Sequence, residues 1–318
     1  MKRRELLQGM ALAGVWAASD RPVRADGPPE RGGPYTGMGR VVQVHHPGAT
    51  DESYRVNSPV VAEMIEAGLR ELTGEPTSEE AWSLILPGYK PGAGIGIKVN
   101  AINRLVPTNP SLVEAAAGSV ARSGVRPRDI IIWDRYTKSL RRAHYSVNLH
   151  EDKVRCFGTD EPGVGHDGSD RARILGHELK LSRILTTLTG HLINAPVLKD
   201  HGATGFTFAL KNHYGTIPLR DGIPFSLGAI MRMHGNGGDP QIAELNAAST
   251  IRLKTRLILG DALIGIVSGG PGGAPQWRPN SIILSRDPVA ADSVALDLLD
   301  RRRSETGLEE IRPRVQWL

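Results

Sequence analysis

Four basic side chains lie within fifteen residues of one another in this chain, namely Lys199, His201, Lys211 and His213. A neutral imidazole moves protons near pH 7, and a lysine holds an anionic substrate or, when desolvated, acts as a base or forms a Schiff base. Glycines at positions 202 and 205 predict a turn between the two pairs. We therefore expect Lys199, His201 and Lys211 to meet at one strand–loop–strand mouth and to be catalytic. The alternative is that the lysines are solvated and the histidines cap loops.

A metal site is the second interpretation of these histidines. A mononuclear site takes about three side-chain ligands, and imidazoles and carboxylates are among the groups that transition metals use. His201 and His213 are the candidate ligands, and the chain has further donors in Asp200, Asp261, Asp292 and His234. Their spacing matches no ligand motif, and His177-Glu178 lacks the second histidine of a zinc-protease helix. The sequence does not identify a cofactor, and one divalent metal ion is an alternative.

The elements that must position these residues follow from the hydrophobic pattern. Short apolar segments alternate with helical patterns, which favours an α/β fold with a largely parallel or mixed sheet flanked by helices. We expect strands over residues 41–44, 95–99, 129–134, 192–195, 256–260 and 281–285. We expect helices over 58–72 and 112–121, and a last helix that Asp287 caps and Pro288 begins. Residues 138–170 show weak periodicity and are expected to form loops.

Parallel sheets bind ligands at the carboxyl ends of their strands, so we expect the site at that edge. Lys98 and Asn100 stand at the end of the strand expected over 95–99, and Asp261 directly follows the strand expected over 256–260. The pattern therefore predicts that these three side chains bind substrate.

Two further polar residues are expected to reach the same edge. Asn212 belongs to the basic cluster, directly after Lys211. Asp292 lies near the start of the last helix, which we expect to pack through Val289, Val294 and Leu298. Both residues complete the expected substrate-binding set.

Two glycine-rich segments match no nucleotide-binding fingerprint. Residues 94–98 enter a strand where the dinucleotide fingerprint must follow one, and residues 269–275 lack the lysine and the Ser or Thr of a phosphate loop. Backbone N–H groups of the second segment can hold a phosphate or carboxylate, and a lid or a plain turn is the alternative. A dinucleotide cofactor is therefore not expected.

The composition is 40% hydrophobic, 23% charged and 5% aromatic, which excludes fibrous and wholly disordered proteins. A length of 318 residues allows one large domain or two intimate lobes. Cys156 is the single cysteine, so an intramolecular disulfide is excluded, and an iron–sulfur cluster or a cysteine-rich zinc site is not expected. An incidental thiol is the expected interpretation of Cys156, with a reactive thiol as the alternative.

The first 25 residues are expected to be an export signal. They combine a charged start at residues 2–4, an apolar stretch over 9–18 and a small-residue exit at 23–25. Arg3-Arg4 resembles the twin-arginine signal, so the twin-arginine export machinery is the expected partner. The alternative is a general secretory signal in which the two arginines are incidental.

This signal predicts a periplasmic or otherwise exported protein that is soluble after cleavage. The apolar stretch is shorter than the ~20 residues that cross a bilayer, so no permanent membrane anchor is expected. Residues 26–39 are rich in glycine and proline and predict a flexible lead-in, and residues 40–318 are expected to form the folded body.

Nucleic acid is not an expected partner. The formal charge of +5 arises mostly in the expected signal, and the remaining basic clusters, at residues 141–142 and 301–303, are small and separated. Few aromatic residues accompany them, and no nucleic-acid-binding motif is present. A small anionic ligand is the expected partner instead.

Several segments together resemble one protein family. Residues 193–201 (Ile-Asn-Ala-Pro-Val-Leu-Lys-Asp-His) and 205–212 (Gly-Phe-Thr-Phe-Ala-Leu-Lys-Asn) are similar to the signature of the domain-of-unknown-function 362 family. Segments 96–100, 109–113 and 287–292 are also similar to the family and occur in its order, so the resemblance runs from about residue 40 to 300. Many relatives carry an appended ferredoxin-type iron–sulfur module, and this sequence shows no such cysteine-rich module. The family label implies a fold and a set of positions, and it implies no settled activity.

We expect an enzyme, an oxidoreductase or isomerase, that acts on a small anionic substrate through lysine, histidine and aspartate side chains, with a metal as a further option. Whether the protein is an enzyme stays open. The alternatives are a non-catalytic periplasmic protein that binds an anion or a metal, and an assembly factor for exported cofactor proteins.

Overall fold

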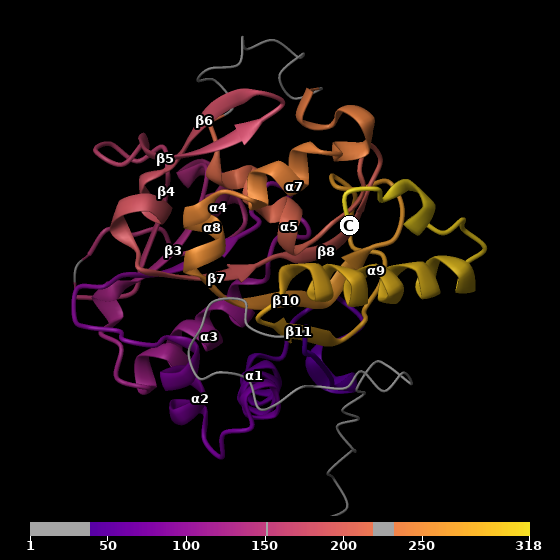
Figure 1. Ribbon diagram of the computed structural model, residues 1–318. Coiled ribbons are helices and arrows are strands. Elements are labelled where there is room, and N and C mark those ends of the chain that lie inside the picture. The colour runs from indigo at the N-terminus through magenta and orange to yellow at the C-terminus, as the bar shows by residue number, and fades with distance from the viewer. Residues whose placement is uncertain (1–38, 151, 219–231) are drawn as a thin grey trace, which may run out of the picture.

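A nine-stranded sheet lies at the centre of the structure, a computed structural model that describes residues 39–150, 152–218 and 232–318 (Figure 1). The main path of the sheet runs β1-β11-β10-β7-β2-β3-β4, and β8 pairs with both β10 and β9. The strands are β1 (Val41–His45), β2 (Ile95–Val99), β3 (Ile130–Asp134), β4 (Arg155–Gly158), β7 (His191–Ala195), β8 (Val197–His201), β9 (Gly205–Thr207), β10 (Thr255–Ile266) and β11 (Ser281–Ser285).

The strand directions make this sheet mixed. Strands β10, β7, β2, β3 and β4 are parallel to their neighbours in that order, and β8 is also parallel to β10. Strand β11 is antiparallel to β10 and to β1, and β9 is antiparallel to β8. The α/β fold with a largely parallel or mixed sheet, predicted from the sequence, is thereby confirmed.

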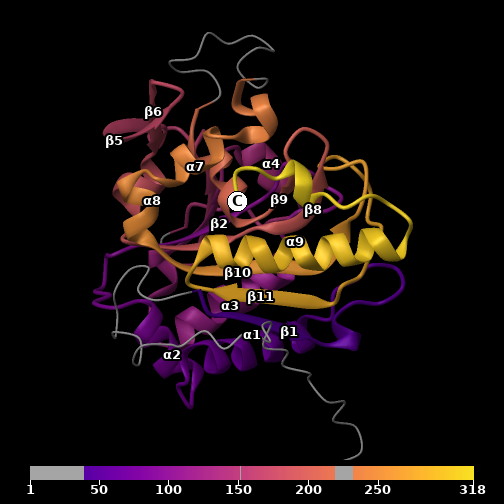
Figure 2. The ribbon, with the colours of Figure 1, turned by 45° about the vertical axis from the view of Figure 1, so that its right-hand side comes forward.

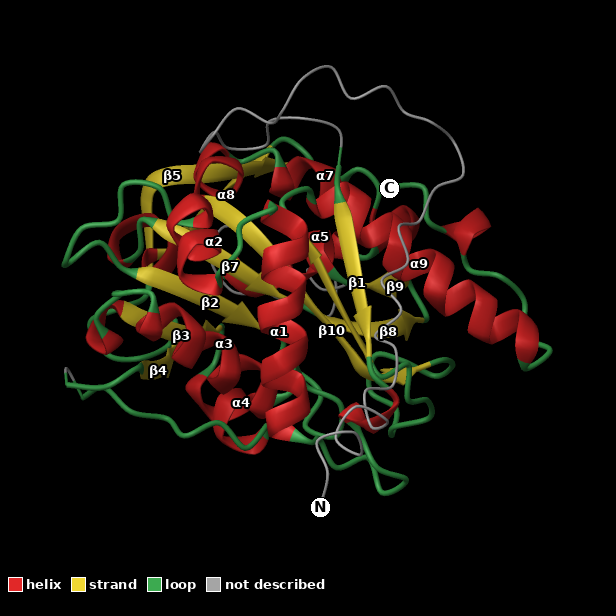
Figure 3. Ribbon diagram, turned by 90° about the horizontal axis from the view of Figure 1, so that it is seen from below, coloured by secondary structure: helices red, strands yellow, loops and turns green. Residues whose placement is uncertain are grey.

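Helices cover both faces of the sheet, as Figures 2 and 3 show from two further directions. Helices α1, α2 and α3 lie on one face, and α5 and α9 lie on the other. The helices are α1 (Ser58–Thr73), α2 (Ser78–Ile85), α3 (Pro110–Arg122), α4 (Thr137–Arg142), α5 (Ala209–Asn212), α7 (Gln241–Asn246), α8 (Ser249–Lys254) and α9 (Pro288–Glu305).

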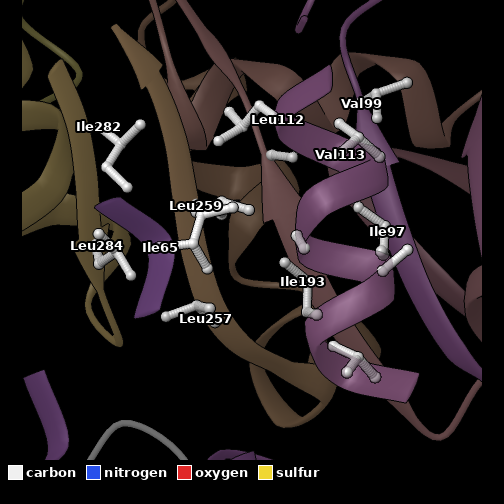
Figure 4. Close-up of a cluster of buried hydrophobic side chains, with 14 of the residues drawn as sticks. Ile65, Ile97, Val99, Leu112, Val113, Ile193, Leu257, Leu259, Ile282 and Leu284 are labelled. Atoms are coloured by element: carbon white, nitrogen blue, oxygen red, sulfur yellow. The ribbon is translucent and has the colours of Figure 1, made fainter. Parts of the chain in front are cut away.

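The core lies on both faces because successive side chains of each central strand point in opposite directions. In β10, Leu257 and Leu259 pack with α1 and α3, whereas Ile258 packs with α5 and α9. Figure 4 shows the first of these two layers, in which Ile65 of α1 meets the strand side chains. Burial on both faces explains why these strands are continuous apolar segments in the sequence.

Local signals in the sequence begin and end the helices where we expected. The Asn109 side chain accepts a hydrogen bond from the backbone N–H of Ser111 at the start of α3. Asp287 does the same for Val289 and Ala290 at the start of α9. Gly74 ends α1 with a φ of +76°, a conformation that favours glycine.

The expectation that residues 138–170 are loops is wrong for three segments of this range. The segment 137–142 forms α4, and β4 adds to the edge of the sheet by pairing Phe157 with Trp133 of β3. A separate antiparallel hairpin, β5 (His166–Ile174) and β6 (His177–Ser182), follows. A four-residue strand is too short to show a period of its own, so its pairing partner determines it.

Two further details differ from the sequence-based expectation. Strand β10 continues past Gly260 to Ile266, because β8 provides a second parallel partner opposite Asp261. Helix α9 does not pack through Val289, which is 47% exposed. Its buried apolar face is formed by Ala291, Ala295, Leu296 and Leu299, and Val294 and Leu298 pack beside them partly buried, as expected. The two alanines on this face allow a close approach to the sheet.

The described residues begin at Gly39, so the expected export signal over 1–25, and the expected lead-in over 26–39 except its last residue, lie outside them. Within the described ranges, no helix has both the length and the apolar character that a membrane span requires.

Candidate functional site

A cavity of about 380 Å³ lies where four strands of the sheet end. The last residues of β3, β8 and β9 and the next-to-last residue of β2 line it, together with α5 and the segment that follows α5. Five residues singled out from the sequence lie in its wall, namely Lys98, Asn100, His201, Lys211 and Asn212. The volume falls within the usual range for small-molecule sites, about 300–1,000 Å³.

Lys98 forms a buried ion pair at one side of this cavity. Its Nζ atom lies 2.8 Å from Oδ1 of Asp134, the last residue of the neighbouring strand β3. The ammonium also donates to the carbonyl oxygen of Val99 at 2.6 Å. Burial lowers the pKa of Lys98, and the charge of Asp134 opposes that shift. The pair therefore offers the cavity little net charge.

Asn212 connects this ion pair to a second buried group. Its Nδ2 donates to the Oδ1 atom of Asn194 at 2.7 Å and to the carbonyl oxygen of Lys98 at 3.2 Å. The side-chain amide of Asn194 in turn lies 3.3 Å from Nε2 of His213. A continuous network of polar side chains thus holds the end of β2, β7 and α5 in a fixed relation.

His213 lies at the far end of that network and does not line the cavity. Burial and the charge of Lys98 lower the pKa of His213 to about 3, so the ring is neutral at physiological pH. Its Nδ1 atom is buried without a hydrogen-bond partner among the residues that the structure describes.

Lys211 has a different environment from Lys98. Its Nζ atom lies 3.3 Å from Nε2 of His234 and 4.9 Å from the centre of the Tyr214 ring. Among the described residues, no carboxylate forms an ion pair with Lys211. Burial, helped by the positive charge of Lys199, lowers the pKa of Lys211 to about 7. A large fraction of this amine is therefore neutral at pH 7.

His201 lines the cavity, and the backbone binds one of its two ring nitrogens. The backbone N–H of Ala203 donates to its Nδ1 atom at 3.2 Å, so the proton of the neutral ring lies on Nε2. The ring stacks on His234 with centroids 5.1 Å apart. Burial and the nearby Lys211 lower the pKa of His201 to about 2. The ring of His201 is thus a neutral hydrogen-bond donor at physiological pH.

Lys199, although fully buried, is not in the cavity wall. Its Nζ atom donates to Oδ1 of Asn100 and to the carbonyl oxygen of Val106, both at 3.1 Å. Burial lowers the pKa of Lys199 to about 7. Lys199 therefore stands behind Asn100 and orients that side chain, which does line the cavity.

Asp261 and Asp292 bind backbone groups and are absent from the cavity wall. Asp261 accepts from the N–H of Asn109 at 2.6 Å, and burial raises the pKa of this carboxyl to about 6. Asp292 accepts from the N–H groups of Ala209 and Leu210 at 2.6 and 3.1 Å. Burial raises the pKa of Asp292, and these two N–H groups oppose the shift. The two carboxylates fix the starts of α3 and α5.

The metal interpretation finds no ligand set within the described ranges. No group of three histidine, cysteine, aspartate or glutamate side chains there is placed to hold a metal ion. His201 stacks on His234 at the cavity, whereas His213 contacts Asn194 in the network behind it.

Two charged residues of the cavity wall were missed from the sequence, namely Asp134 and Arg135. Asp134 ends a strand next to that of Lys98, so the rule that selected Lys98 also selects it. Arg135 follows directly and donates through Nε to the carbonyl oxygen of Ile217 at 3.1 Å and through the guanidinium to that of Tyr214. His234, which the sequence offered only as a further metal donor, is brought into this wall by tertiary structure.

Apolar side chains form a further part of the wall. Ile102 and Tyr136 line the cavity while 71% and 39% exposed, and Ile217 and Met233 line it from the other segments. Large exposed apolar side chains beside cationic groups suit a ligand that carries both an anionic group and an apolar part.

Comparisons with known proteins give a family match and distant structural similarity to solved structures. The model of the family described as "Domain of unknown function (DUF362)" matches residues 95–297. The crystal structure of a protein from Thermotoga maritima is similar at a TM-score of 0.44 and 12% sequence identity, over 77% of this chain. The aligned part is 59% of that protein's length, so this chain spans about three fifths of it. No curated protein matches the chain.

Proposed function

The chain belongs to the DUF362 family, whose description names no activity, and we propose that it is an enzyme that moves a proton on a small anionic substrate held in the cavity. The observation that carries this proposal is the Lys211 amine, which lines the cavity without a carboxylate counter-ion among the described residues. The proposed class is closest to an isomerase. An oxidoreductase would need a redox partner in addition.

Charge supports the choice of an anion. Asp134 is the one carboxylate among the described residues of the cavity wall, and Lys98 already pairs with it at 2.8 Å. Arg135 stays protonated at neutral pH and occupies the same wall. The guanidinium of Arg135 and the protonated fraction of Lys211 can therefore bind a carboxylate or a phosphate.

The protonation states of Lys211 and His201, which line the same cavity, support proton transfer. The Lys211 amine, with a pKa of about 7, is near the ideal value for a base at neutral pH. The neutral His201 ring donates from Nε2, which suits it to polarise a substrate oxygen without giving up its proton. One group that accepts a proton and one that stabilises developing negative charge then lie in one wall.

The test combines binding and isotope exchange. We expect small carboxylates to raise the melting temperature of the full chain, and we expect a substrate C–H to exchange with deuterium from heavy water in an NMR time course. Lys211→Met should abolish exchange, and Arg135→Gln should weaken binding, while Lys90→Met, at an exposed lysine, should leave both unchanged. Binding without any exchange would favour a non-catalytic anion-binding protein, and exchange retained in Lys211→Met would contradict the proposed base.

We also propose that the protein is exported by the twin-arginine route, with residues 1–25 as signal, 26–39 as lead-in and 40–318 as the folded body. The pattern of charges and apolar residues over 1–25 supports this. Replacing Arg3 and Arg4 by lysine should block processing and leave the chain in the cytoplasm of a bacterial host. Normal processing of that variant would favour the general secretory route, and an unprocessed wild-type chain would contradict export.

A further inference from the structure

Two lysines line the same cavity, and they differ in what surrounds the nitrogen. Lys98 Nζ has the carboxylate of Asp134 at 2.8 Å, whereas Lys211 Nζ has an imidazole nitrogen at 3.3 Å and an aromatic ring. A buried ammonium without a counter-ion is costly, so a buried lysine in this setting tends to lose its proton. The geometry therefore gives Lys98 the role of a charge and Lys211 the role of an amine with an available lone pair.

A third lysine keeps its amine away from ligands. Lys199 is as deeply buried as Lys98, but its Nζ atom is bound to Asn100 and Val106 and lies outside the wall. Its charge, when present, disfavours a second charge on Lys211. A nearby cationic group and an apolar surrounding are the two features that activate a lysine as a nucleophile.

The groups around Lys211 suit addition to a carbonyl. The imidazole of His234 lies beside the Lys211 nitrogen, and the Nε2–H of His201 belongs to the same wall. Arg135 provides a fixed positive charge for a carboxylate on the same molecule. A compound with a carbonyl next to a carboxylate could react with the Lys211 amine, accept a hydrogen bond from His201 and pair with Arg135 at the same time.

We propose that Lys211 forms an imine with the carbonyl group of a 2-oxo acid that carries an apolar side chain. The inference rests on the proposed function and names the substrate class for the same site. The apolar side chain would lie against Ile102 and Tyr136, which are partly exposed at the cavity.

The reaction balances without a redox partner. The amine lone pair forms a C–N bond to the carbonyl carbon, and the carbonyl π electrons move to the oxygen, which takes a proton to give a carbinolamine. The nitrogen loses its proton and the hydroxyl leaves as water after protonation, which leaves the C=N bond. The protonated imine makes the hydrogens of the adjacent carbon more acidic. In this form Lys211 acts through the imine and not as the free base, and the imidazole of His234, 3.3 Å from the Lys211 nitrogen, accepts the proton that the proposed function moves.

Trapping by reduction tests the imine directly. The full chain is mixed with 2-oxohexanoate and sodium borohydride, which delivers hydride to the imine carbon and makes the C–N bond permanent. We expect one adduct per chain, with a mass equal to that of the oxo acid less one oxygen atom. Peptide mapping of the wild-type protein should place it on Lys211, so localisation does not depend on a variant that folds.

The selectivity expected for Lys211 is large. At pH 7.4 an ordinary lysine with a pKa near 10.4 is neutral in about one molecule in a thousand. An amine with a pKa of about 7 is mostly neutral at that pH. Labelling of Lys211 should therefore exceed that of the exposed Lys90 or Lys138 by roughly a hundredfold or more. Comparable labelling of all three lysines would overturn the proposal.

A matched acid separates this inference from the proposed function. The compound 2-hydroxyhexanoate has the same carboxylate and apolar part but no carbonyl, so it should raise the melting temperature, block trapping in excess and form no adduct. Lys211→Arg should abolish the adduct, and Lys90→Arg should retain it. If both acids bind and no adduct forms on Lys211, the imine is wrong and the proposed function stands. If neither acid binds, the proposed function fails for this substrate class.

Discussion

Asp292 on α9 accepts a hydrogen bond from the backbone N–H of Ala209 at 2.6 Å. The Ala209 N–H is the first of α5, the helix that carries Lys211 into the cavity wall, and the second carboxylate oxygen accepts from Leu210. A residue 81 positions beyond Lys211 in sequence therefore determines where that amine lies. The contact joins the helix on one face of the sheet to the site at its edge.

Removal of this carboxylate should destabilise the protein and displace Lys211. Asp292→Ala leaves two buried N–H groups without acceptors, which should lower the free energy of unfolding by about 2–4 kcal/mol. Asp292→Asn retains one acceptor oxygen and should lose less. Urea unfolding measures both variants. Asp297→Ala, at an exposed residue of the same helix, should change the free energy by less than about 1 kcal/mol, and a loss there equal to that of Asp292→Ala would contradict this assignment.

The Lys98–Asp134 pair should show strong coupling in a double-mutant cycle. Asp134→Asn leaves the buried Lys98 ammonium without its counter-ion, so it should cost about 3–5 kcal/mol of unfolding free energy. Adding Lys98→Met to that variant removes the unpaired charge and should recover part of the loss. Additive losses, measured by urea unfolding of the four proteins, would show that the pair is not energetically coupled.

Two buried lysines, Lys199 and Lys211, predict how stability depends on pH. Lys199 and Lys211 have a pKa of about 7 in the folded protein against an ordinary value of 10.5, so between these values the unfolded chain binds more protons. Each of these lysines therefore contributes a rise in the free energy of unfolding with pH across this window, by up to about 1.4 kcal/mol per pH unit. This contribution to stability is lost again as the pH falls towards 7.

Lys211→Met provides the comparison for that profile. The variant lacks the Lys211 amine, so the free energy of unfolding of the wild type relative to the variant should rise between about pH 7 and pH 10, by up to about 1.4 kcal/mol per pH unit. Lys90→Met should follow the wild-type profile because that lysine is exposed. Parallel profiles for wild type and Lys211→Met would mean that Lys211 is protonated in the folded state.

Cys156 should be unreactive in the folded protein. The thiol is 3% exposed, and burial raises its pKa to about 12, so almost no thiolate is available at neutral pH. A thiol reagent such as Ellman's reagent should label the native chain slowly and the urea-unfolded chain at once, with one thiol per chain. Immediate labelling of the native protein would reveal an opening near β4 that the packing does not show.

The apolar part of the cavity wall predicts a preference for longer acids. Two additional buried methylene groups contribute about 1.6 kcal/mol, so 2-hydroxyhexanoate should bind roughly tenfold more tightly than 2-hydroxybutyrate in calorimetry. Ile102→Ser should reduce that difference, while Leu253→Ser, at an exposed position on α8, should not. Equal affinities for the two acids in the wild-type protein would remove the apolar wall from the binding site.

Much of the scaffold follows from local features of the chain. The pairs Asn109-Pro110 and Asp287-Pro288 begin helices because a side-chain oxygen and a preset φ act within one turn. The expected strands are apolar throughout because both faces of the sheet are covered. The rule that polar residues at strand ends gather at one edge led to Lys98 and Asn100, which line the cavity.

Long-range contacts assign the roles of the remaining residues. A carboxylate in a sequence can hold a ligand, a cation or a backbone N–H, and Asp261 and Asp292 hold N–H groups that would otherwise be buried without acceptors. The same applies to the lysines, since nothing in the sequence shows that Lys98 meets a carboxylate whereas Lys211 meets an imidazole and an aromatic ring. Burial and partners come from segments distant in the chain, and they determine which amine carries a charge and which is free to react.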